Sequence, residues 1–198
     1  MLDIQIRLEE VKDYQEVELV AHAAFYRDER IEDIGVGCTE HFMIHKLREK
    51  DGIRELNFVA TLNEKIVGHV IYSNSYIMSD NGKRIETLNV GPLSVLPDFQ
   101  NQGVGSKLMQ FSIERATELG YGAIVFFGHP TYYPRFGFVE AKEFEITTAW
   151  GANYPAFMAM ELKEGYLKNS HGKYFEAEIY DEGITKLPAK EYDKRFNI

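Results

Sequence analysis

Hydrophobic and polar residues alternate along several short stretches of the chain, which is the pattern of half-buried β-strands. The expected strands cover residues 4–8, 57–62, 66–72, 85–95, 123–127, 138–140, 144–147 and 157–162. Residues 123–127, Ala-Ile-Val-Phe-Phe, are apolar at every position. An unbroken apolar run is typical of a strand that is covered on both faces, as parallel strands are.

Apolar residues that recur every three or four positions predict helices between these strands. The expected helices cover residues 13–25, a segment around 42–47, residues 104–119 and residues 189–196. Gly120 directly follows the third of these helices, as a C-cap glycine would. The order strand, helix, buried strand from residue 85 to 127 predicts a right-handed βαβ crossover. The chain therefore reads as one domain of mixed α/β type.

Composition narrows the class of protein. The chain has 198 residues, 44% of them hydrophobic, and no stretch approaches the roughly 20 apolar residues of a membrane helix. The first ten residues carry acidic side chains where a signal peptide would be basic and then apolar. Cys38 is the only cysteine, which excludes an internal disulfide and a multi-thiolate metal site. We expect a cytoplasmic protein that does not bind membranes.

Charge narrows the choice of partner. The net charge of −9 argues against a nucleic-acid-binding surface, which needs a basic patch, and favours a cationic small substrate. The six histidines are scattered along the chain. His41 and His45 lie one helical turn apart but lack a third ligand, so no metal site is expected.

Gly103 and Gly105 stand at the mouth of the third expected helix, in the segment Val-Leu-Pro-Asp-Phe-Gln-Asn-Gln-Gly-Val-Gly-Ser. The first turn of a helix carries backbone N–H groups without intrahelical partners, and an anion can accept those bonds where no side chain blocks its approach. The alternative is a tight strand-to-helix turn without a ligand. The sequence contains no P-loop pattern, Gly-x-x-x-x-Gly-Lys-Ser/Thr. The dinucleotide-binding pattern Gly-x-Gly-x-x-Gly is also absent, because Leu108 stands where its third glycine would be.

The residues that flank the glycines make this segment resemble the acetyl-CoA-binding motif of the GNAT superfamily of N-acetyltransferases. The motif reads Val95-x-Pro97-x-x-Gln100-x-x-Gly103-x-Gly105-x-x-Leu108. A second segment, Tyr133-Pro134-Arg135-Phe136-Gly137-Phe138, is similar to the Tyr-x-x-x-Gly-Phe that follows the fifth strand in this family.

The resemblance covers residues 4 to 162 and implies the GNAT fold, a mixed and mostly antiparallel sheet whose parallel fourth and fifth strands splay apart between flanking helices. On this basis residues 1–162 form the acetyltransferase domain. Residues 163–198 form a C-terminal extension that packs on the same domain.

The resemblance also implies the binding site for acetyl-CoA, the co-substrate. The backbone of Leu93, Ser94 and Val95 would hold the pantetheine arm, and the N–H of Val95 or Leu93 would polarise the thioester carbonyl. The pyrophosphate site implied by the motif consists of Gln100, Asn101, Gln102, Gly103, Val104, Gly105 and Ser106. Phe126 departs from the family, because many relatives carry an asparagine that touches the cofactor arm at this spacing.

Tyr133 matches the tyrosine that protonates the departing sulfur in this family; the alternative is an aromatic packing residue. The general base stays open. Asn89 stands where several family members carry a glutamate, and the nearest carboxylate, Glu86, faces the other way by strand alternation unless a bulge at Gly91-Pro92 resets the register. His129, just past the fifth strand, is a second candidate, and ordered water is a third.

The expected reaction is acetyl transfer from acetyl-CoA to a primary amine of a small molecule or a protein, by direct attack within a ternary complex. A non-catalytic acyl-CoA-binding or regulatory module is the alternative. The acceptor, the role of the C-terminal extension and the oligomeric state, a homodimer included, stay open.

Overall fold

The structure is a computed structural model that describes residues 2–196. These residues form two compact units. The first unit comprises residues 2–71, 91–111 and 178–196, and the second comprises residues 72–90 and 112–177. The expected domain boundary at residue 162 falls inside the second unit, and the C-terminal extension contributes to both units.

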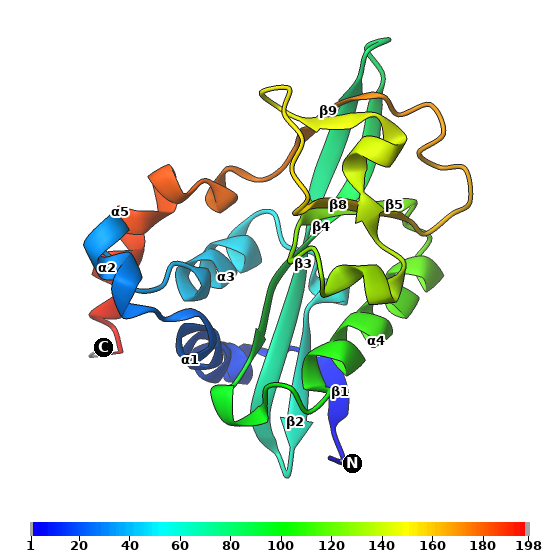
Figure 1. Ribbon diagram of the computed structural model, residues 1–198. Coiled ribbons are helices and arrows are strands. Elements are labelled where there is room, and N and C mark those ends of the chain that lie inside the picture. The colour runs from blue at the N-terminus through cyan, green and yellow to red at the C-terminus, as the bar shows by residue number, and fades with distance from the viewer. Residues whose placement is uncertain (1, 197–198) are drawn as a thin grey trace. The chain divides into compact units, whose positions relative to one another are not determined.

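The first unit contains three antiparallel strands and most of the helices. β1 (Gln5–Leu8) pairs with β2 (Phe58–Leu62), which pairs with the first half of β3 (Lys65–Ser79). The helices that lie wholly in this unit are α1 (Tyr14–Phe25), α2 (Asp28–Ile34), α3 (Glu40–Glu49) and α5 (Glu182–Asp193). α1 and α3 lie side by side (Figure 1). Their apolar residues pack with those of β2 and β3 in one cluster, which includes Val17, Ala21, Ile44, Leu47, Val59 and Ile66.

A buried charge network joins α3 to its neighbours in the first unit. Arg48 of α3 donates hydrogen bonds to Glu9 at 2.9 Å and to Glu18 of α1 at 2.5 Å. The side chains of Arg48, Glu9 and Glu18 are at most 6% exposed. Asn57 donates to Glu9 at 2.5 Å, and its oxygen lies 2.6 Å from His69 Nε2. Burial lowers the pKa of His69 well below its usual value, so this imidazole is neutral.

The second unit contains the remaining strands of the sheet, apart from residues 91–95, which belong to the first unit. β5 (Ala123–Phe127) runs parallel to β4 (Arg84–Val95) and antiparallel to β8 (Phe157–Glu161), which pairs with β6 (Val139–Glu140). β9 (Gly172–Phe175) pairs antiparallel with the end of β3 and parallel with β7 (Ile146–Thr148). The hydrophobic core of the second unit includes Ile77, Ile85, Ala123, Val125, Phe157 and Tyr174. The expected fold class, a mostly antiparallel sheet with a parallel β4/β5 pair and flanking helices, is confirmed.

Several elements differ from the sequence expectations. β3 continues to Ser79, and α2 and β9 were not expected at all. α5 begins at Glu182, where the side chain of Asp181 accepts a hydrogen bond from the N–H of Gly183 at 2.8 Å, and it contains Pro188. The sequence pattern predicted a later start, at residue 189, directly after this proline; proline is rare inside helices. The expected strand at residues 144–147 is shorter, because a 3-10 helix occupies Ala141–Phe144.

Candidate functional site

The turn between β4 and α4 (Val104–Glu118) is braced by two glutamine side chains. Gln100 Nε2 donates to the carbonyl of Val95 at 3.0 Å, and Gln102 Nε2 donates to the carbonyl of Asp98 at 2.7 Å. Both amides therefore hold the backbone of the turn to the end of β4 and to the 3-10 helix Pro97–Phe99. This gives the glutamines of the motif a structural role that the sequence did not reveal.

Two residues of this turn have a left-handed backbone. Asn101 has φ +59° and Gly103 has φ +87°, a region that side chains with a Cβ adopt at a cost. The carbonyl of Gly103 accepts the bond from Lys107 N at 3.0 Å, so the helical hydrogen bonding of α4 begins here. A Cβ on Gly103 would have no atom within 4 Å. The backbone conformation therefore favours a glycine at position 103, and the space beside it is open.

The backbone N–H groups of residues 101–106 have no hydrogen-bond partner among the residues that the structure describes. Asn101, Gln102 and Gly103 are exposed to solvent. The dipole of α4, a helix of 15 residues, adds partial positive charge at the same end of the helix. The turn therefore suits an anion with several acceptor oxygens, such as a pyrophosphate.

Close packing fixes the first turn of α4 on the sheet of the first unit. A Cβ on Gly68 of β3 would lie 3.1 Å from the carbonyl oxygen of Ser94 and 3.2 Å from Val104 Cγ1. Ser94 is buried, whereas Leu93 and Val95 on either side of it are half-buried. The ten residues expected to bind the co-substrate all belong to the first unit. Gly68 was missed by sequence reasoning, because a single glycine in a strand carries no motif.

Tyr133 lies in the second unit, at the start of the 3-10 helix Tyr133–Phe136. Its ring packs edge-on against Phe126 of β5, with centroids 4.7 Å apart, and against Phe138 at 5.8 Å. A Cβ on Gly128 would come within 2.5 Å of this ring, so the glycine makes room for it. Burial raises the pKa of Tyr133, and its hydroxyl therefore keeps its proton at neutral pH.

His129 and Glu86, the two candidates for the base, lie in different parts of the second unit. His129 is exposed, its Nδ1 lies 3.0 Å from Thr131 Oγ1, and its carbonyl is 3.4 Å from Tyr133 N. Glu86 is exposed and accepts a hydrogen bond from Arg84 Nε at 2.7 Å. The structure therefore brings His129 into the turn of Tyr133 and engages Glu86 with a surface arginine.

Glu176 is a carboxylate that sequence reasoning missed. It follows β9 and accepts a hydrogen bond from Asn89 Nδ2 of β4 at 2.5 Å. No local pattern marks it, because the two residues are 87 positions apart. Asn89 was singled out in the sequence by its place in the fourth strand, and it is the partner that reveals Glu176.

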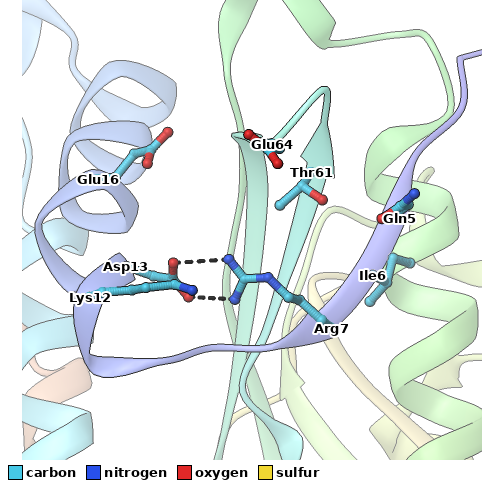
Figure 2. Close-up of a pocket in the computed structure, with 8 residues that line it drawn as sticks. All are labelled: Gln5, Ile6, Arg7, Lys12, Asp13, Glu16, Thr61 and Glu64. Carbon is cyan, nitrogen blue, oxygen red and sulfur yellow. Dashed lines mark hydrogen bonds and ion pairs between the residues drawn. The ribbon is translucent and has the colours of Figure 1, made fainter.

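A charged cavity of about 620 Å³ lies beside β1 and α1 in the first unit. Figure 2 shows Arg7 reaching across it to both carboxylate oxygens of Asp13, at 2.5 and 2.9 Å. Its remaining lining residues are Gln5, Ile6, Lys12, Glu16, Thr61 and Glu64. Glu16 also accepts a bond from Ile66 N at 3.0 Å. Arg7, Asp13 and Glu16 therefore already bond to one another or to the backbone.

A family model and related sequences place this chain in the same family of proteins. Residues 54–140 match the family model described as "Acetyltransferase (GNAT) domain". The chain is 30% identical over 131 residues to the uncharacterized N-acetyltransferase YhbS of Escherichia coli K12, which covers 66% of this chain and 76% of YhbS. It is 31% identical over 97 residues to the uncharacterized N-acetyltransferase YjhQ of the same strain, over 48% of this chain and 53% of YjhQ.

Solved structures agree with these relatives. The crystal structure of YhbS from E. coli in complex with CoA has a TM-score of 0.77 to this chain at 25% identity, and the match covers 91% of this chain and 93% of that one. A GNAT family acetyltransferase from Brucella melitensis in complex with acetyl-CoA shares the fold, with a TM-score of 0.67 at 24% identity over 91% and 100% of the two chains.

Proposed function

The chain belongs to the GNAT superfamily of N-acetyltransferases, and on that premise we propose that it transfers the acetyl group of acetyl-CoA to a primary amine of a small molecule or a protein. The amine attacks the thioester directly within a ternary complex. The observation that carries this proposal is the run of N–H groups at residues 101–106, before and within the first turn of α4, which have no partner within residues 2–196.

The first unit binds the co-substrate in this proposal. The pyrophosphate of CoA accepts hydrogen bonds from the N–H groups of residues 102–106, beside Asn101, while Gln100 and Gln102 hold the turn in shape. The backbone of residues 93–95 lies along the pantetheine arm, and the N–H of Leu93 or Val95 polarises the thioester carbonyl. The structure of the similar protein YhbS contains bound CoA, which supports CoA as the group that is bound.

The side chains proposed to donate and accept protons belong to the second unit. Tyr133 donates its proton to the departing thiolate, and the phenol is available for this step because it is protonated at neutral pH. The sequence candidates for the proton acceptor are His129 and Glu86. The proposal includes no metal ion.

The setting of the reaction follows from two features of the chain. The net charge of −9 favours a cationic acceptor, such as an amine in its ammonium form. We place the enzyme in the cytoplasm because its one cysteine, Cys38, is a buried free thiol. Among residues 2–196, every helix is too short or too polar to cross a lipid bilayer.

The experiment that tests this function measures two quantities on the purified protein. Calorimetry with CoA reports binding, and release of free CoA thiol from acetyl-CoA reports turnover with spermidine, a lysine-containing peptide and a peptide with a free α-amino group. Binding and amine-dependent thiol release are expected. Binding without release for any amine favours the acyl-CoA-binding module instead, and absence of binding overturns the proposal.

A further inference from the structure

The contact between Asn89 and Glu176 joins two distant segments of the second unit. Asn89 lies in β4 and is 3% exposed, and its Nδ2 donates to Glu176 Oε2 at 2.5 Å. Glu176 directly follows β9, whose pairing with β3 sets Tyr76 opposite Phe175. The rings of Tyr76 and Phe175 stack with centroids 5.1 Å apart. Glu176 is therefore positioned by a paired strand rather than by a free tail.

This contact lies where β4 and β5 part. Within the described residues, the pairing of these two parallel strands is confined to Leu88 and Ile124, and Asn89 is the next residue of β4. Side chains alternate along a strand, so Asn89 faces away from Leu88, whereas Phe126 shares the face of Ile124. Tyr133 packs against Phe126. The Asn89–Glu176 pair and Tyr133 thus border the parting of the strands from opposite faces.

The carboxylate of Glu176 is half-buried and has no cationic partner among residues 2–196. The groups that face it are Asn89 from β4 and the hydroxyl of Tyr174 from β9, at 3.5 Å. Burial raises the pKa of Glu176 to about 7, and the hydrogen bonds from Tyr174 and Asn89 act against that rise. A carboxylate that titrates near neutral pH is suited to accept and release protons in catalysis.

We propose that Glu176, held by Asn89, is the proton acceptor for the attacking amine, an inference that rests on the proposed acetyl transfer. Glu176 takes one proton from the ammonium group, which frees the nitrogen lone pair. The lone pair forms the C–N bond to the thioester carbonyl carbon, and the C–S bond breaks with its electron pair going to sulfur. The thiolate takes the proton of Tyr133, and the next proton lost by nitrogen restores the phenol through solvent. Glu176 finally gives its proton to solvent, so the products are the amide, the CoA thiol and one proton.

The structure favours Glu176 over the two candidates from the sequence. Glu86 is exposed, and its carboxylate is already engaged in an ion pair with Arg84. His129 is exposed, with Nδ1 bonded to Thr131. Glu176 alone of the three combines partial burial, the absence of a cationic partner in the described chain and a place beside the parting of β4 and β5.

Glu176→Gln tests the proposal, because glutamine keeps an oxygen that can accept from Asn89 while losing the titrating group. We expect amine-dependent thiol release to fall about 100-fold, with CoA binding unchanged. The rise of kcat/KM with pH through about 7 is expected to disappear. Glu178→Gln, two residues along and exposed, is the matched control and is expected to leave turnover and its pH profile unchanged.

Asn89→Ala separates a role in proton transfer from a role in tethering the chain. Removing the donated hydrogen bond raises the pKa of Glu176 further, so the limb of the pH profile is expected to move to higher pH. Loss of a tether alone would lower activity at every pH without moving the limb.

Stability against pH gives a readout that needs no acceptor. The folded pKa of Glu176 lies above its unfolded value, so this group contributes stability at pH values below about 4.5 that is lost as pH rises through about 7. Wild type is therefore expected to lose stability relative to Glu176→Gln between pH 5 and pH 8, measured by urea unfolding.

The possible results distinguish the two proposals. Undiminished turnover with an unmoved pH profile in Glu176→Gln overturns the assignment of Glu176 and leaves the acetyltransferase standing. A pH-independent stability difference between the two proteins also overturns it. Absence of thiol release by wild type overturns the proposed function, and the proton acceptor with it.

Discussion

Gly103 and Gly120 stand at opposite ends of α4 with nearly the same backbone conformation, φ +87° and +85°. A Cβ on either would meet no atom within 4 Å. Asparagine tolerates this conformation better than other side chains, so Gly103→Asn and Gly120→Asn are expected to lower stability by similar amounts. They differ in function, because only Gly103 adjoins the unpartnered N–H groups of the anion site.

The added side chain in Gly103→Asn is expected to weaken CoA binding about 10- to 100-fold, the equivalent of losing one hydrogen bond to a charged group, about 1.5–3 kcal/mol. Gly120→Asn is expected to bind CoA as wild type does. Calorimetry on the two variants checks the prediction. Equal CoA affinity in both would show that the first turn of α4 does not hold the pyrophosphate.

Tyr133 combines a packed ring with a hydroxyl that stays protonated at neutral pH. Tyr133→Phe keeps the ring contacts with Phe126 and Phe138 and removes only the acid, so turnover is expected to fall about 100-fold with CoA binding unchanged. Tyr132→Phe, in the same turn, is the control and is expected to retain turnover. Steady-state thiol release decides the matter, and a Tyr133→Phe protein as fast as wild type would leave Tyr133 a packing residue.

At the scale of elements, α3 is anchored by the ion pairs of Arg48 with Glu9 and Glu18. Arg48→Met would remove the arginine that pairs with two buried carboxylates, and the expected loss of unfolding free energy is about 3–5 kcal/mol. Arg115→Met removes an arginine of α4 whose pair with Glu118 is exposed, and a loss below about 1 kcal/mol is expected. Urea unfolding of both variants gives the comparison, and similar losses would show that burial adds nothing to the Arg48 pairs.

Elements with a local signal were predicted well from the sequence. β5 has the expected bounds because all five residues are apolar, and α4 starts at Val104 as its periodicity indicates. β9 was missed because its four residues become a strand only through pairing with β3 and β7. The proposed site residues also differ in whether neighbouring residues of the sequence mark them. The glycine turn stands in consecutive residues, whereas Glu176 depends on a contact with Asn89 across 87 positions of sequence.

At the scale of the whole molecule, the C-terminal segment of the chain contributes to both compact units. The residues proposed to bind CoA belong to the first unit, whereas Tyr133, Asn89 and Glu176 belong to the second. The motifs seen in the sequence end before residue 163, yet the second unit continues to residue 177. The last stretch of that unit is therefore part of the proposed chemistry rather than a peripheral addition.

The pairing of β9 with the end of β3 also has a consequence for solubility. A chain shortened to residue 162 would leave the backbone groups of Tyr76 to Ser79 unpaired on that side, and open sheet edges recruit strands from other molecules. Such a shortened protein would tend to self-associate into aggregates even if every motif residue were present. β9 thus protects this edge of the sheet from pairing with a strand of a second copy of the protein.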